Sequence, residues 1–139
     1  MKKLREIKKN QKGFTLVEVI VVLVILAIMA AVLVPSLVGY IDKARQNTIV
    51  TETRSIVTAV QTLASEKYAK NGDTATTTYN LGDTETDTVI AYSGIQALCE
   101  ISVNDSNLEA TVVGGRLTTL TYTSDGYKCT YPNYTVTEE

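Results

Sequence analysis

The chain has 139 residues, the size of one ordinary domain, and a formal net charge of −2. The charge is uneven: residues 1–13 contain six Lys or Arg and one acid, whereas residues 14–139 contain seven Lys or Arg and fourteen acids. The sequence has no His and no Trp, which excludes imidazole-based catalysis and His-ligated metals. The acidic body also argues against nucleic acid as the main partner, because phosphate binding needs clustered Lys and Arg.

An apolar segment follows the basic residues 1–13, which lack apolar periodicity and are typical of a targeting leader. From Val19 to Ile41 the chain runs for 23 residues without a charge. As a helix with a rise of about 1.5 Å per residue, this stretch is long enough to cross a bilayer core of about 30 Å. Because Lys and Arg hold their end in the cytoplasm, we expect the acidic body to lie outside the membrane.

Glu18 lies near the start of this apolar segment and is not explained by a plain membrane anchor. An unpaired carboxylate there costs on the order of a few kcal/mol even on mild insertion scales. A cut between Gly13 and Phe14 would supply a partner, because the new α-amino group would lie one helical turn from the carboxylate. A secretory signal peptide fits poorly, since the apolar run is too long and has no A-x-A-like site. A single-pass anchor fits the length and stays open.

These residues resemble the N-terminus of type IV pilins and their pseudopilin relatives. The resemblance rests on the sequence KG-FTLVEV, with an acid at the fifth position after the glycine, and on the unbroken apolar run behind it. It implies that a membrane peptidase cuts after Gly13 and methylates the new N-terminal residue, Phe14. It also implies that Glu18 is needed for methylation and for assembly.

Two further features belong to the resemblance. Pro35 matches a proline found in many family members, and the sequence IDKARQ at residues 41–46 resembles the segment in which the helix leaves the membrane. Ala27 stands where many relatives have a glycine. Because Pro35 removes the N–H that would bond the Ala31 carbonyl, we expect a local kink or melting of the helix there.

The resemblance implies a structural subunit of a type IV pilus filament, for adhesion or surface motility, and neither an enzyme nor a cofactor-binding protein. Expected partners are copies of the chain, a prepilin peptidase and methyltransferase, an assembly ATPase with inner-membrane platform proteins, and lipid before assembly. The subunit would wait in the bacterial cytoplasmic membrane and end in the extracellular pilus. Two alternatives are a pseudopilin of a type II secretion or competence DNA-uptake system, and a single-pass membrane-tethered binding module.

Residues 42–70 continue the helical pattern as an amphipathic helix. Ile49, Ile56, Val60 and Leu63 recur at spacings of seven, four and three, which places them on one stripe. Asn-Gly-Asp at residues 71–73 is a helix stop signal. We therefore predict one helix from 14 to 70, made of a hydrophobic part over 14–41 and an amphipathic part over 42–70.

Residues 71–139 are rich in Thr and predict a β-sheet region. Apolar residues alternate with polar ones over 108–113, 119–123 and 127–131, with turn signals at Gly-Gly and at Ser-Asp-Gly between them. This pattern predicts an antiparallel meander of three or four strands whose apolar face covers the helix stripe. The expected fold is therefore α+β, a long N-terminal helix packed on a small antiparallel sheet.

Residues 73–103 carry weaker signals. The stretch 74–81 reads as a polar loop or an edge strand, and 93–98 as a short helical turn that leads to a strand at 100–103.

Cys99 and Cys129 are the two cysteines, and both belong to the part expected outside the membrane. An even count in an oxidising compartment favours a disulfide, which many pilins have in this region. Two buried thiols are the alternative.

Acidic side chains gather in GDTETDT, at residues 82–88, and in NDSNLE, at residues 104–109. Their oxygens could hold Ca²⁺, but neither stretch is a full EF-hand pattern. A solvated acidic loop is therefore the simpler interpretation, and no metal site is predicted.

Overall fold

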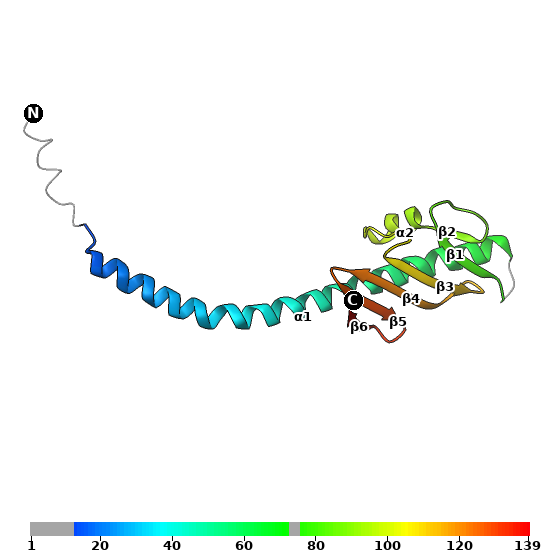
Figure 1. Cartoon of the computed structure of the whole chain (residues 1–139). Coiled ribbons are helices and arrows are strands. Elements are labelled where there is room, and N and C mark those ends of the chain that lie inside the picture. Colours follow the sequence, from blue (N-terminus) through cyan, green and yellow to red (C-terminus); the bar gives the residue numbers. More distant parts are fainter. Residues whose placement is uncertain (1–12, 73–75) are drawn as a thin grey trace, which may run out of the picture. The chain divides into compact units, whose positions relative to one another are not determined.

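A computed structural model describes residues 13–72 and 76–139, and the chain divides after Ile41 into two compact units. Most of the predicted leader and residues 73–75 lie outside the described residues. Figure 1 shows a sheet lying along the later part of a long helix, with a short helix next to the strand labelled β2. The long helix and the mainly antiparallel sheet confirm the predicted α+β fold.

Helix α1 runs over 56 residues, Leu16–Asn71, and so confirms the predicted long helix to within two residues at each end. It ends at the expected stop signal, where Gly72 has a positive φ of 64°. Glycine adopts this left-handed conformation without a steric cost, which is why it commonly follows the last helical residue.

The amphipathic part of α1 buries one face against the sheet. Its buried residues include three of the four stripe residues, and Leu63 packs partly buried beside them. Thr53 is also fully buried, and its hydroxyl donates to the Ile49 carbonyl at 2.7 Å. A buried hydroxyl is tolerated when it is hydrogen-bonded in this way. The buried residues of α1 are Ile49, Thr53, Ile56, Ala59, Val60 and Ala64.

The sheet has six strands in the spatial order β2-β1-β3-β4-β5-β6, and neighbours are antiparallel except β1 and β2, which are parallel. Its strands are β1 Thr78–Gly82, β2 Val89–Ala91, β3 Leu108–Val113, β4 Arg116–Ser124, β5 Tyr127–Tyr131 and β6 Thr135–Glu138.

The predicted meander is confirmed as β3-β4-β5, with tight turns at the two predicted signals. Gly114 and Gly115 both have positive φ, as do Asp125 and Gly126 in the second turn. Such paired positive φ values suit two-residue hairpins, because they match the twist of the flanking strands. The alternating residues of β3, β4 and β5 bury one face, as expected.

The remaining predictions for this region need correction. The sheet has six strands and not three or four, and β1 lies between β2 and β3 and is not an edge strand. The short helical turn is confirmed as α2, Tyr92–Cys99. The strand predicted at 100–103 is wrong: Glu100 has a φ of 58°, in the left-handed region, and residues 101–104 form no strand. Val103 is buried nevertheless, so its apolar character reflects packing and not a strand.

Candidate functional site

Thr15 caps the beginning of α1. Its side-chain oxygen accepts the backbone N–H of Glu18, with 3.2 Å between the two atoms. This hydrogen bond makes Thr15 the N-cap and places Glu18 at the third helical position, the Thr-x-x-Glu spacing of a capping box. Glu18 therefore lies in the first turn, where the positive end of the helix dipole stabilises a carboxylate.

Phe14 lies just before the cap, and the other predicted processing residue, Gly13, precedes it outside the helix. With Glu18, Val19, Val22 and Leu23, the Phe14 side chain lines an open, mostly apolar hollow. Phe14 and Val19 occupy the positions before the cap and four residues after it, which is the spacing of a hydrophobic staple. The start of α1 thus brings the predicted cleavage residue and the predicted assembly acid to one turn.

The first unit leaves its apolar side chains uncovered. Every large hydrophobic residue from Phe14 to Ile41 is exposed, between 44% for Ile41 and 81% for Phe14. Leu98 is the one other exposed large hydrophobic among the residues that the structure describes. By length and composition α1 can cross a membrane, and none of its most apolar stretch is buried. Such a surface needs lipid or other protein against it.

Pro35 lies inside α1 without interrupting it, so of the predicted kink or melting, the melting is absent from the structure. Proline removes one backbone hydrogen bond but its fixed φ of about −65° is itself helical, and the turns on both sides keep their own bonds. The hydroxyl of Ser36 also donates to the Leu33 carbonyl at 2.9 Å. Gly39 follows one turn later with open space around its Cα.

The predicted disulfide is not formed, because Cys99 and Cys129 are both free thiols. Cys129 of β5 is fully buried and belongs to the core cluster, which also contains the buried apolar residues of α1. Cys99 is the last residue of α2 and lies beside Ser55 and Ala59 of α1. Helix α2 follows β2, which is the first strand in the spatial order of the sheet, whereas Cys129 lies in β5, the fifth strand. The number of cysteines does not show how far apart they lie. The structure contains two free thiols, of which Cys129 is buried, as the alternative expected, and Cys99 is only partly buried.

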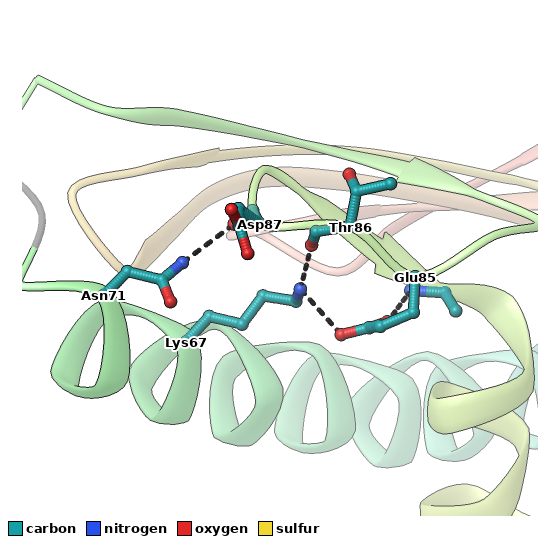
Figure 2. A network of polar contacts seen from close by, with 6 residues as sticks. Lys67, Asn71, Glu85, Thr86 and Asp87 are labelled. Atoms are coloured by element: carbon teal, nitrogen blue, oxygen red, sulfur yellow. Dashed lines mark hydrogen bonds and ion pairs between the residues drawn. The ribbon is translucent and has the colours of Figure 1, made fainter.

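The acidic loop between β1 and β2 is tied to the last turns of α1 (Figure 2). Lys67 forms an ion pair with Glu85 at 2.6 Å and donates to the carbonyl of Thr86. Asn71 donates through Nδ2 to the carbonyl of Asp87 at 3.0 Å. The second Glu85 oxygen accepts the backbone N–H of Ala91 at 2.7 Å. Side chains of α1 thus hold loop 83–88 against the helix.

Glu85 is held in its charged form by these contacts. Partial burial by itself would raise the pKa of its carboxyl group, but the hydrogen bonds from Lys67 and from the Ala91 N–H, together with the positive charges of Lys67 and Lys70, lower it below the ordinary value of 4.5. Across the described residues 13–72 and 76–139, no three His, Cys, Asp or Glu side chains gather closely enough to hold a metal ion.

Three residues of this geometry were not identified from the sequence. Thr15 could have been, because the Thr-x-x-Glu spacing is visible in TLVE. The other two are Lys67 and Gln61, whose side chain accepts the backbone N–H of Leu117 in β4. They could not have been identified, because their partners in loop 83–88 and in β4 lie 19 and 56 residues away along the chain.

Residues 8–34 match the family model described as the prokaryotic N-terminal methylation motif. This match contains the predicted cleavage site, the capped first turn and Glu18. The chain has the N-terminus of a type IV pilin-like protein. The N-terminal motif predicted from the residues around Gly13 is thereby confirmed.

Curated relatives of this pilin-like chain agree with the motif. The chain is 37% identical over 75 residues to the type IV major fimbrial protein FimA of Dichelobacter nodosus, covering 53% of this chain and 48% of the relative. It is 28% identical over 110 residues to a fimbrial protein of Pseudomonas aeruginosa, covering 78% and 71%. It is 40% identical over 53 residues to the type II secretion system core protein G of Klebsiella michiganensis, covering 38% and 37%.

The match thus spans about half the length of the FimA relative and less of core protein G. No solved structure matches the pilin-like chain. The names of these relatives describe fimbrial and secretion-system proteins and not enzymes.

Proposed function

We propose that the chain is a structural subunit of a type IV pilus filament, cut between Gly13 and Phe14 and methylated on Phe14. One observation carries this proposal: the methylation motif opens a helix whose large apolar side chains are all exposed over residues 14–41 and whose first turn holds a single carboxylate, Glu18. An uncovered surface of this kind is suited to lipid before assembly and to copies of the same helix afterwards.

Assembly would exchange lipid for neighbouring helices. In a bilayer, apolar helices gain little by meeting, because acyl chains are as apolar as Leu and Val. In the filament core, Glu18 would pair with the new amino group of Phe14 on an adjacent subunit, so that both charges are neutralised. Such a pair often adds little net stability, and its value here is to define the axial register of the subunits.

The capping geometry favours this pairing. Because Thr15 holds the Glu18 backbone in the first turn, the carboxylate stays at the positive end of α1, next to the residue that would carry the amine. The proposed partners are further copies of the chain, a prepilin peptidase and methyltransferase, lipid, and an assembly ATPase with platform proteins. The proposed location is the cytoplasmic membrane before assembly and the cell exterior after it, with a role in adhesion or motility.

Mass spectrometry of the mature protein tests the processing step. The expected chain begins with methylated Phe14. A mature chain that begins with Met1 would refute processing and would favour the membrane-tethered binding module, which keeps its leader and forms no crosslinks between neighbouring helices.

Replacement of Glu18 tests the pairing step. Glu18→Ala should leave the subunit in the membrane and abolish filaments. Glu109→Ala is the matched control, because Glu109 is an exposed acid on β3 and lies outside α1. The pairing mechanism is refuted if the Glu18→Ala strain makes filaments in normal number.

A pseudopilin of a secretion or DNA-uptake system is the second candidate. It is favoured by relatives named type II secretion system core protein G in Klebsiella michiganensis and Vibrio cholerae, the latter 52% identical over 52 residues. Electron microscopy of the cell surface separates the two candidates, because a pilus subunit gives long fibres and a pseudopilin gives none.

A further inference from the structure

Asn71 and Gly72 form the one Asn-Gly pair in the sequence, at the exposed end of α1. Asn71 is the last residue of the helix, and Gly72 has a φ of 64° with no atom near enough to contact an added Cβ. The side chain of Asn71 extends toward loop 83–88 (Figure 2), where its Nδ2 donates to the Asp87 carbonyl at 3.0 Å. The Asn71 side chain is thus held by a hydrogen bond, whereas no neighbouring atom crowds Gly72.

We propose that Asn71 is a site of spontaneous deamidation, at a rate set by the contacts that hold loop 83–88 on α1. The backbone nitrogen of Gly72 attacks Cγ of Asn71 and loses its proton; a bond forms between the two atoms, the bond from Cγ to Nδ2 breaks, and ammonia leaves. Water then opens the cyclic imide at either carbonyl and gives aspartate or isoaspartate. Gly72 favours the reaction because no side chain shields its nitrogen.

The folded structure opposes this reaction in two ways. Helical backbone at Asn71 holds Cγ away from the Gly72 nitrogen, so the last turn must open before the ring can close. The hydrogen bond to Asp87 and the contacts of Lys67 with Glu85 and Thr86 both resist that opening, because they fasten the last two turns to the loop. Local opening of a helix end is governed by such contacts.

Deamidation of Asn71 would weaken the contacts between α1 and loop 83–88, which are the contacts that slow the reaction. An aspartate at position 71 has no N–H to donate to the Asp87 carbonyl, and it adds a negative charge beside a loop that already carries Asp83, Glu85 and Asp87. Isoaspartate in addition lengthens the main chain by one carbon at the helix end. Each product therefore loosens the attachment of loop 83–88 to α1.

The test follows deamidation in the purified full-length chain in detergent during long incubation at mildly alkaline pH. Peptide mapping by tandem mass spectrometry measures conversion at each asparagine, and an isoaspartate-specific methyltransferase labels the second product. Asn71 should convert faster than Asn133, which is exposed but precedes Tyr134. Lys67→Met should raise the rate at Asn71 about two- to tenfold, the factor that corresponds to one ordinary hydrogen bond.

Two variants complete the test. Glu85→Gln removes the charge of the Lys67 partner and one of its two acceptor oxygens but leaves Lys67 free to donate to the Thr86 carbonyl, so it should give a smaller increase than Lys67→Met. Circular dichroism checks that both variants fold. Asn71→Gln should remove the signal, because the longer side chain closes a six-membered ring much more slowly. Equal conversion of Asn71 and Asn133 would refute Asn71 as a preferred deamidation site. An unchanged rate in a folded Lys67→Met variant would refute the claim that the contacts of loop 83–88 set the rate. These rates require no filament, so they stand apart from the proposed function.

Discussion

Gln61 of α1 accepts the backbone N–H of Leu117 in β4, with 2.9 Å between Oε1 and the nitrogen. Through Nε2 the same carboxamide donates to the carbonyl of Gly115, also at 2.9 Å. The register of β3 with β4 shifts between Thr111 and Val112, close to this contact. A helix side chain therefore satisfies backbone groups at the start of β4, where the strand pairing is irregular.

Removing this carboxamide should destabilise the second unit. In Gln61→Ala a partly buried N–H and a carbonyl lose their partners, which costs about 1–3 kcal/mol in the free energy of unfolding. Urea unfolding of the detergent-solubilised chain, followed by circular dichroism, measures the change. Thr62→Ala is the control, because its exposed hydroxyl bonds only the Thr58 carbonyl of its own helix. Equal midpoints for the two variants would show that the Gln61 contacts are not important for stability.

Gly115 should tolerate no side chain. An added Cβ would lie 2.5 Å from the Cβ of Tyr68, and the φ of Gly115 is 72°. Gly115→Ala should therefore cost more than Gly72→Ala, where φ is also positive at 64° but the space is open. The backbone conformation alone costs about 1–2 kcal/mol in each variant, and overpacking adds about 1–3 kcal/mol at Gly115. Thermal unfolding of both variants measures the difference, and similar melting temperatures would contradict the steric part.

The contribution of Glu85 should depend on pH. Its folded-state pKa lies below the ordinary value of 4.5, so its contacts stabilise the folded state above that value and are lost as the pH falls through the lower, folded-state pKa. The difference in unfolding free energy between the wild type and Glu85→Gln should thus be present at neutral pH and disappear in acid. It should be small, because the Glu85 side chain is 58% exposed. A difference that grows in acid would contradict this sign.

The cap at Thr15 should affect assembly. Thr15→Val keeps the shape of the side chain but removes the acceptor for the Glu18 N–H, and loss of an N-cap costs about 0.5–2 kcal/mol of helix stability. The frayed first turn should hold Glu18 less well, so fewer filaments are expected. Thr15→Ser keeps the acceptor and should assemble normally. Filament yield by electron microscopy, with membrane levels of the subunit as control, decides this, and normal yield in Thr15→Val would exclude the role.

The two cysteines should react separately with a thiol reagent. Cys99 is partly exposed and should be labelled in the folded protein, whereas Cys129 is fully buried and should react only after unfolding. Mass spectrometry counts the labels before and after denaturant. A protein in which neither thiol reacts until it is reduced would contain the disulfide that is absent from this structure.

The features that could be predicted from the sequence are those with short-range signals. The helix follows from periodicity and from its Asn-Gly stop, and β3-β4-β5 follow from alternation between turn signals. The cleavage motif and Glu18 lie within six residues of one another. Strand β2 has only three residues, and β6, Thr135–Glu138, has one apolar residue, so neither carries a recognisable pattern. The attachment of loop 83–88 depends on Lys67, a side chain distant in sequence. Whether Cys99 and Cys129 can form a disulfide depends on the distance between them in the folded chain, which the sequence does not show.

The position of the sheet in the chain determines when the second unit can fold. The core strands β3, β4 and β5 all follow residue 107, and the helix residues that they cover, such as Ile56 and Val60, precede residue 65. During synthesis the apolar side of the emerging helix must stay uncovered until about half of the chain has followed it. Early termination before β5 would leave that side bare, and the truncated chain would bind chaperones or aggregate.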